Sequence, residues 1–557
     1  MTSSILNHLI FLYGEDKAQQ TYENVQQLLA AYRLRLPKPE TAVFSERDSV
    51  LITYGDQVQA PGEAPLQALA KFCNETLHGR IQTIHLLPFY PYSSDDGFSV
   101  IDYKAVDPAL GSWGDVAAVG ENFQLMFDAV INHISAKSSW FQGYLQDDPA
   151  YEDFFVALDP TLDLTAVFRP RALPLLTPFQ TKSGTRHLWT TFSDDQIDLN
   201  YANPAVLLAI LDTLLFYVAQ GANYIRLDAI GFMWKEPGTR CLNLPQTHQI
   251  IQLMRTVLDE VAPQVALITE TNIPHKENIA YFGNGRNEAQ MVYNFSLPPL
   301  ILHAFHNGNA SYITDWAATL ELPSDQVTFF NFCASHDGIG LTPARGILSD
   351  GAIDAMAERV KALGGFVSYK ANGDGSQSAY ELNISYLNAL AVPGADESEE
   401  LIARRFLASQ AIMLALRGVP GIYFHSLFGS QNWREGVQQT GRNRTINRQK
   451  LQRSQLEQAL QGGLRQRVFS GYCELLRLRT AEKAFHPIGN QEILSLHPAV
   501  FAILRQHQNE QVLCLQNVSP ETVSVSLPFA GRDLLADTAV SHQISLAPYQ
   551  VVWIKQL

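Results

Sequence analysis

Eight short apolar runs, rich in β-branched and aromatic residues, alternate along the chain with longer stretches of helical periodicity. The runs are residues 50–54, 83–87, 125–130, 224–228, 265–270, 291–295, 327–332 and 421–424. Strands that alternate with helices form parallel sheets, and eight such units close into a (β/α)8 barrel. The sequence therefore predicts an α/β fold built on a TIM barrel over residues 49–485.

The spacing between the runs locates two insertions. The third and fourth runs end about 100 residues apart, whereas one strand-to-strand unit takes roughly 30–40 residues. We therefore expect an inserted domain after strand 3, at about residues 135–200. The same reasoning predicts a second loop excursion after strand 7, at about residues 340–400. Long loops of barrel enzymes belong to the catalytic end of the barrel, so both segments are expected near an active site.

The two ends of the chain have patterns of their own. Residues 1–48 have helical periodicity and predict an N-terminal extension, which Pro37 and Pro39 are expected to end. Residues 486–557 alternate apolar and polar side chains, and this pattern predicts a small C-terminal antiparallel β domain.

The composition narrows the classes of function. Hydrophobic residues make up 46% of the chain and charged residues 17%, which is enough for a large core. A net charge of −15 disfavours nucleic acid and anionic membranes as partners. The five cysteines lie far apart with no CxxC, which argues against a disulfide framework and a zinc site. Since the sequence has neither a signal-peptide pattern nor an apolar stretch long enough to span a bilayer, we expect a cytoplasmic protein.

Charged side chains stand at the ends of several predicted strands. Arg226 and Asp228 are two residues apart in a strand and point to the same face, where the arginine keeps the carboxylate ionised. Other strand ends carry Glu270, the pair His336–Asp337, and Asp128 followed by Asn132 and His133. Carboxylates that meet at a barrel mouth suit glycoside cleavage, in which one attacks and another, kept protonated, donates to the leaving oxygen.

Each of these residues also has a structural explanation when taken alone. A carboxylate at a strand end can cap a helix, and Arg226 with Asp228 can form a structural ion pair. Residues 336–338 can form a turn, and His133 can be an ordinary buried histidine. Their joint occurrence, in order, at the ends of different strands favours one shared catalytic site.

The same residues carry a resemblance to a known family. The four conserved regions of the α-amylase family are similar to residues 128–133, 226–228, 269–270 and 336–337. The sucrose phosphorylase subfamily resembles the chain over longer strings, at residues 85–98, 110–115, 336–340 and 444–448. The bacterial glucosylglycerate phosphorylases resemble it over residues 169–180, 186–198 and 269–275. The resemblance covers nearly the whole chain, including the helical N-terminal extension.

The resemblance implies roles for the residues at the strand ends. Asp228 would be the nucleophile, Glu270 the general acid/base, and Asp337 a third carboxylate that holds sugar hydroxyls. The implied glucose subsite consists of Asp95, Phe98, His133, Arg226, His336 and Arg444. Neither a cofactor nor a metal ion is implied.

Further residues are implied to bind phosphate and the acceptor. Arg171 matches a loop arginine credited with phosphate contact, and Arg444 is a second candidate. The acceptor position would include Tyr380 and Glu381, with Lys235 or a loop arginine balancing the charge of an anionic acceptor. Asn272 stands where sucrose phosphorylases often place histidine, which argues against fructose as the acceptor.

The activity that the resemblance implies is that of a retaining glycoside phosphorylase. It would transfer glucose from 2-O-α-glucosylglycerate to inorganic phosphate through a β-glucosyl-enzyme, giving α-glucose 1-phosphate and glycerate, reversibly. Sucrose, sucrose 6-phosphate and glucosylglycerol are alternative substrates for the same mechanism, and α-glucoside hydrolysis is a different reaction class. A non-catalytic scaffold is disfavoured because all three carboxylates are present. The expected partners are a small glucoside and phosphate, and the chain is expected to be a monomer or homodimer.

Overall fold

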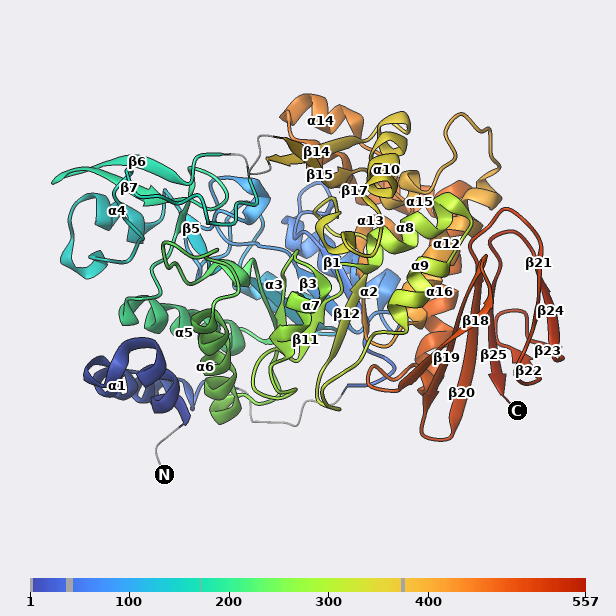
Figure 1. The fold of residues 1–557 in the computed structure, drawn as a ribbon, viewed down its shortest axis with the longest axis horizontal. Helices are drawn as coiled ribbons and strands as arrows, with labels where there is room; N and C mark the ends of the chain where they lie inside the picture. The colour runs from blue at the N-terminus through green and yellow to red at the C-terminus, as the bar shows by residue number, and fades with distance from the viewer. Residues whose placement is uncertain (1–3, 37–43, 172, 372–375, 557) are drawn as a thin grey trace.

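The computed structural model describes residues 4–36, 44–171, 173–371 and 376–556. At its centre, eight parallel strands close into a barrel in which each strand pairs with the next one along the chain (Figure 1). The strands are β1 (Val50–Thr53), β3 (Thr83–Leu86), β4 (Gln124–Ala129), β9 (Ala222–Leu227), β10 (Ala266–Thr269), β11 (Met291–Tyr293), β12 (Thr328–Phe332) and β16 (Val419–Tyr423). The predicted TIM barrel and its eight strands are confirmed.

The barrel strands are buried on both of their faces. Every residue of β1, β3, β10, β11, β12 and β16 is buried, which explains why these segments read as continuous apolar runs and not as alternating ones. The helices that cover the outside include α2 (Pro65–Leu77), α5 (Pro204–Ala219), α6 (Pro245–Val261), α8 (Leu297–Asn307), α12 (Glu399–Ala415) and α16 (Gly463–Ala481).

The chain makes an excursion between the third and fourth barrel strands, as predicted. A short antiparallel pair joins β5 (His133–Ser135) to β8 (Gln196–Asp198), and a hairpin pairs β6 (Leu176–Thr181) with β7 (Gly184–Trp189). Because β5 follows directly on β4, the β5–β8 pair holds the base of this insertion at the barrel mouth.

A second excursion follows β12, the seventh barrel strand. It contains a three-stranded sheet in the order β13 (Ile339–Gly340), β15 (Gln377–Asn383) and β14 (Phe366–Ala371), together with α10 (Asp350–Ala362). Residues 372–375, between β14 and β15, lie outside the described residues.

The N-terminal helix and the C-terminal strands lie on opposite sides of the molecule (Figure 1). Helix α1 (Ser4–Tyr32), interrupted at Gly14 with φ 74°, packs against α5 and α6. It ends at Tyr32, and the predicted end at Pro37 and Pro39 lies outside the described residues. The exact limits of the units, at residues 48/49 and 485/486, stay a prediction.

The C-terminal segment forms the predicted antiparallel β structure. A six-stranded sheet has the order β18 (Asn490–His497), β19 (Val500–His507), β20 (Glu510–Asn517), β25 (Val551–Gln556), β22 (Gly531–Asp533) and β23 (Thr538–Val540). A separate pair, β21 (Val523–Ser526) with β24 (Gln543–Leu546), completes a hydrophobic core of its own.

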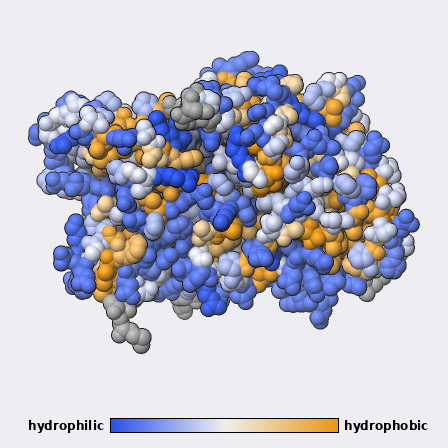
Figure 2. All heavy atoms as spheres, in the orientation of Figure 1, coloured by the Kyte–Doolittle hydropathy of each residue, from blue (hydrophilic) through white to orange (hydrophobic). Residues whose placement is uncertain are grey.

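The surface and the thiols add two observations. On the face of the molecule seen in Figure 1, hydrophobic residues lie in separate patches among hydrophilic ones (Figure 2). Across the described residues, no helix combines the length and the hydrophobicity needed to cross a membrane. All five cysteines are free.

Candidate active site

Asp228 and Glu270 come directly after two neighbouring barrel strands, β9 and β10. The Asp228 amide donates to the Ala129 carbonyl at 3.1 Å, and the Glu270 amide donates to the Leu227 carbonyl at 3.2 Å. The parallel ladder therefore continues one residue past each strand, so the backbone fixes both carboxylates at the carboxyl-terminal mouth of the barrel.

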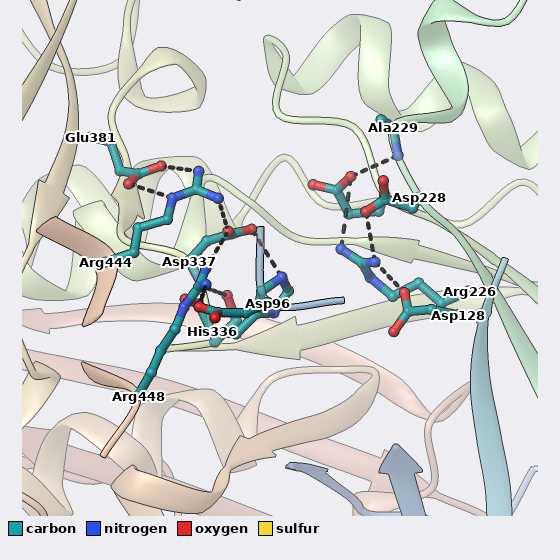
Figure 3. A network of polar contacts seen from close by, with 12 residues as sticks. Asp96, Asp128, Arg226, Asp228, Ala229, His336, Asp337, Glu381, Arg444 and Arg448 are labelled. Carbon is teal, nitrogen blue, oxygen red and sulfur yellow. Dashed lines mark hydrogen bonds and ion pairs between the residues drawn. The ribbon is translucent and has the colours of Figure 1, made fainter. Parts of the chain in front are cut away.

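Arg226 links these two carboxylates to a third, deeper one. Its Nη1 donates to Asp228 Oδ1 at 2.9 Å and also to Asp128, its register partner on β4. Its Nη2 lies 3.8 Å from Glu270 Oε2. Asp128 in turn pairs with His85 Nε2 at 2.7 Å. Arg226, only 2% exposed, thus holds both candidate catalytic carboxylates in fixed positions. Figure 3 shows its contacts with Asp128 and Asp228.

The two carboxylates differ in how strongly they hold a proton. Burial raises the pKa of Glu270 to about 7, a rise that Arg226 opposes and the neighbouring charge of Asp228 supports. Burial also raises the pKa of Asp228, where the Arg226 hydrogen bond opposes the rise. Because the guanidinium binds Asp228 more closely than Glu270, the proton that the pair shares resides on Glu270.

The residue after Asp228 has an unusual backbone conformation. Ala229 is left-handed, with φ 49° and ψ 32°, which costs an alanine about 1 kcal/mol or more. This turn aims the Ala229 amide at Glu270 Oε2, to which it donates at 3.0 Å. The strained turn therefore orients the Glu270 carboxyl group beside Asp228.

Asp337 lies in a second charged group, on the other side of the site in Figure 3. It pairs with Arg444, which also donates from Nε and Nη2 to Glu381 at 3.0 and 2.6 Å. Arg448 pairs with Asp96 and donates from Nε to the His336 carbonyl at 2.8 Å. Burial alone would raise the pKa of Asp337, but Arg444 and Arg448 hold it well below its usual range. The Asp337 carboxylate is therefore ionised.

Phe98 and His336 form an aromatic wall. Their rings stack with centroids 4.6 Å apart and planes within 4°. Burial lowers the pKa of His336 to about 3, so its imidazole is neutral. The preceding turn places Asp95 at the same wall, and Gly97, with φ 108°, passes so close to the Pro88 carbonyl that an added Cβ would lie 2.6 Å from the oxygen.

His133 is positioned by a buried network. Its Nε2 donates to the Phe98 carbonyl at 2.8 Å, which leaves Nδ1 to accept from Asn132 at 3.3 Å. Asn132 and Asp198 together bind the Lys235 ammonium, at 2.9 and 2.7 Å. Lys235 does not line the cavity, because this ion pair holds its charge between the barrel and the insertion.

A cavity opens above the carboxylates. Its walls include every predicted site residue except Lys235 and Arg226. Arg226 lies behind the wall and contacts two of the lining residues, Asp228 and Glu270. Arg171 and Phe168 come from the first insertion, whereas Tyr380 and Glu381 come from β15 in the second. The two excursions thus provide the outer part of the cavity.

Some residues at the site were not predicted. Arg448 and Asp96 each lie a few residues from a predicted residue, but their ion pair joins segments 352 residues apart. The cavity is also lined by aromatic and amide side chains from the first insertion and from β9–α6, namely Phe168, Phe192, Gln196 and Phe232. Within the described ranges, no three His, Cys, Asp or Glu side chains are grouped so as to hold a metal ion.

The chain is similar to known proteins in sequence and in fold. A model of the α-amylase catalytic domain matches residues 79–338. A glucosylglycerate phosphorylase of Spirochaeta thermophila is 50% identical, covering 98% of this chain and 97% of its own. The chain belongs to the α-amylase family.

Two further relatives share a smaller fraction of identical residues with this chain. A sucrose phosphorylase of Agrobacterium vitis is 31% identical over 78% of this chain and 88% of its own. The crystal structure of sucrose 6F-phosphate phosphorylase from Thermoanaerobacter thermosaccharolyticum superimposes with a TM-score of 0.75 at 22% identity. It covers 89% of this chain and 98% of its own, and it shows that the fold is shared.

Proposed function

We propose that the protein is a retaining glucosylglycerate phosphorylase. The observation that carries the proposal is the relative of that name, which is 50% identical over 98% of this chain. The sucrose phosphorylase relative shares fewer residues and covers less of the chain. The reaction is glucosylglycerate plus phosphate in exchange with α-glucose 1-phosphate plus glycerate.

The first half-reaction breaks the glycosidic bond. Glu270, which holds its proton near neutral pH, donates it to the glycosidic oxygen as glycerate leaves. Asp228, kept ionised by Arg226, attacks the anomeric carbon from the opposite side and forms a β-glucosyl ester. The charge of the attacking carboxylate is consumed in the new bond.

The second half-reaction transfers glucose to phosphate. Formation of the ester removes the Asp228 charge, so the pKa of Glu270 falls and this group stays ionised after giving up its proton. It then accepts the proton of the incoming phosphate, whose oxygen displaces Asp228 at the anomeric carbon. Two inversions give the α-configured product.

The surrounding residues hold glucose and the incoming anion. Asp337 and Asp95 present carboxylates to the sugar hydroxyls, Arg444 holds Asp337 in place, and Arg226 orients the catalytic carboxylates. His133, whose two ring nitrogens are bound to Phe98 and Asn132, forms part of the cavity wall. The stacked rings of Phe98 and His336 give the sugar an apolar wall. Arg171 supplies a cation for phosphate, and Tyr380 and Glu381 lie on the acceptor side.

The test offers glucose 1-phosphate to the purified protein with glycerate, fructose, fructose 6-phosphate and glycerol in parallel. We expect glycerate to give the fastest phosphate release. Faster release with fructose or fructose 6-phosphate would replace the acceptor and leave the mechanism unchanged. Release of free glucose from glucosylglycerate at the same rate with and without phosphate would make the protein a hydrolase.

A further inference from the structure

The loop that follows β3 has a strained tip. Its two arms, residues 91–93 and 99–101, pair through backbone hydrogen bonds. At the tip, Asp95, Asp96 and Gly97 have φ angles of 54°, 50° and 108°. An aspartate enters this left-handed region more readily than most residues do but, unlike glycine, at a cost. Contacts from outside the tip must therefore hold these residues in place.

The same tip carries part of the sugar-binding wall. Asp95 and Phe98 line the cavity, and the Phe98 ring stacks on His336 with centroids 4.6 Å apart. Asp96, between them, pairs with Arg448. The conformation of the tip therefore determines where the Asp95 carboxylate and the Phe98 ring lie relative to glucose.

One carboxylate outside the loop binds three of its serine hydroxyls. Asp195 Oδ2 accepts hydrogen bonds from the hydroxyl groups of Ser93 and Ser94, both at 2.5 Å. The Ser99 hydroxyl donates to the same oxygen at 2.8 Å. Hydrogen bonds to an ionised acceptor are roughly twice as strong as those between neutral groups. Because these serines lie on both sides of the tip, a single carboxylate oxygen holds both arms of the loop.

The first insertion fixes this carboxylate at the barrel mouth. Asp195 directly precedes β8, and the Ser135 hydroxyl on β5 lies 2.5 Å from Ser93 Oγ. Because Ser93 gives its proton to Asp195, Ser135 donates to Ser93 and joins the loop to the β5–β8 pair. The next residue, Gln196, donates from Nε2 to the Phe98 carbonyl at 2.8 Å. Asp195 itself lies outside the cavity lining, so it acts on glucose only through the loop.

We propose that Asp195 is a positioning residue of the glucose subsite, because its three serine contacts hold the left-handed tip in the conformation that presents Asp95 and Phe98 to glucose. This inference rests on the glucosyl transfer of the proposed function and not on the choice of acceptor. Without Asp195, the tip relaxes to conformations that bind glucose poorly. The apparent affinity then falls with the fraction of molecules in the competent conformation, whereas a saturating donor restores that conformation. The signature is a raised KM for the donor with an unchanged kcat.

The test compares Asp195→Ala, Asp195→Asn and a control, Asp194→Ala, with the unaltered protein. Asp194 is exposed, adjacent in sequence and outside the cavity lining. Fluoride release from α-glucosyl fluoride is measured at saturating phosphate, because this donor carries glucose without an acceptor. Thermal melts report folding, and phosphorolysis of glucosylglycerate tests the proposed function separately.

We expect Asp195→Ala to raise the KM for α-glucosyl fluoride by roughly 10- to 100-fold, the cost of one to two left-handed residues. The kcat should change by less than about 3-fold, since saturating donor restores the loop. Asp195→Asn keeps a neutral acceptor oxygen, so its KM should lie between those of the unaltered protein and Asp195→Ala. Asp194→Ala should resemble the unaltered protein.

Two outcomes would overturn this role of Asp195. One is a lower kcat at unchanged KM in the Asp195 variants, which indicates loss of active protein through a general structural defect. The other is an unchanged KM with an unchanged kcat. If Asp195→Ala does not fold, Asp195→Asn gives the same comparison.

Failure of the proposed function is distinguishable from failure of this inference. An unaltered protein that releases fluoride but does not cleave glucosylglycerate would refute the proposed acceptor, while the KM of the Asp195 variants still decides the positioning role. An unaltered protein that releases no fluoride from α-glucosyl fluoride would refute both.

Discussion

Arg444 binds Glu381 through two parallel hydrogen bonds, from Nε to Oε1 at 3.0 Å and from Nη2 to Oε2 at 2.6 Å. Glu381 is only 2% exposed, so the carboxylate of this bidentate ion pair is buried, whereas Arg444 is half-buried. Because the remaining nitrogen of Arg444 pairs with Asp337, one guanidinium joins the acceptor segment to the barrel carboxylate. The charge of Glu381 is thereby neutralised before any acceptor arrives.

Removing Glu381 should therefore weaken the protein and the sugar site together. We expect Glu381→Ala to lower the free energy of unfolding by about 1–3 kcal/mol, since two charged hydrogen bonds to a half-buried arginine are lost. We also expect a higher KM for the glucoside, because Arg444 no longer holds Asp337 in place. Thermal melts and steady-state kinetics measure the two effects. Glu381→Gln keeps an acceptor oxygen and should lower the free energy of unfolding less than Glu381→Ala does. Equal stability of the unaltered protein and both variants would contradict this role of Glu381.

Asp228→Asn should abolish the covalent route. The amide is not a nucleophile, so turnover should fall by roughly 10⁴-fold or more. Intact-protein mass spectrometry after reaction with a slow fluorinated glucosyl donor should show a glucosyl adduct on the unaltered protein and none on the variant. An adduct of equal yield on both proteins would place the nucleophile elsewhere.

The pH dependence should follow Glu270. Its pKa is raised to about 7 and the acid form is needed to cleave the glucoside, so kcat/KM for the glucoside should fall as the pH rises through about 7. Glu270→Gln should lower this parameter by roughly 10²- to 10⁴-fold and remove the alkaline decline. With α-glucosyl fluoride, which needs no protonation, formation of the glucosyl-enzyme should be largely restored. A decline that persists in the variant would assign it to another group.

The Lys235–Asp198 pair should contribute to stability. Both side chains are buried, so Lys235→Met leaves an uncompensated carboxylate and should cost about 3–5 kcal/mol of unfolding free energy. Adding Asp198→Asn should recover part of the loss in a double-mutant cycle measured by denaturant or thermal unfolding. As a control, Lys182→Met replaces an exposed lysine of the first insertion, to which Asp198 also belongs. It should change the free energy of unfolding by less than about 0.5 kcal/mol. Losses that simply add in the double variant would exclude coupling.

The barrel was predictable because its signal is local. Strands buried on both faces, such as β10 (Ala266–Thr269), read as nearly unbroken apolar runs. A polar residue that directly follows such a run, here Glu270, lies at the mouth by the geometry of a parallel barrel. The positions of the two insertions followed from spacing alone. These features require no knowledge of which distant segments meet.

The ion pairs of the site were not predictable, because they join segments that are far apart in the sequence. The sequence offers Lys235 or a loop arginine to balance an anionic acceptor, and Lys235 instead pairs with Asp198 from the first insertion, a contact that no local pattern encodes. The neutralisation of Glu381 likewise depends on Arg444, 63 residues away. Sequence reasoning identified the charged residues, and only the fold determines which of them stay free.

The outer part of the cavity is assembled from two separate excursions, Arg171 in one and Tyr380 with Glu381 in the other, whereas Asp228 and Glu270 stand on the barrel itself. The residues that bind and cleave at glucose and the residues that select the acceptor therefore belong to different segments of the chain. An engineer can exchange either outer stretch to redirect the sugar to a new recipient while the chemical step stays untouched, and natural divergence can follow the same route.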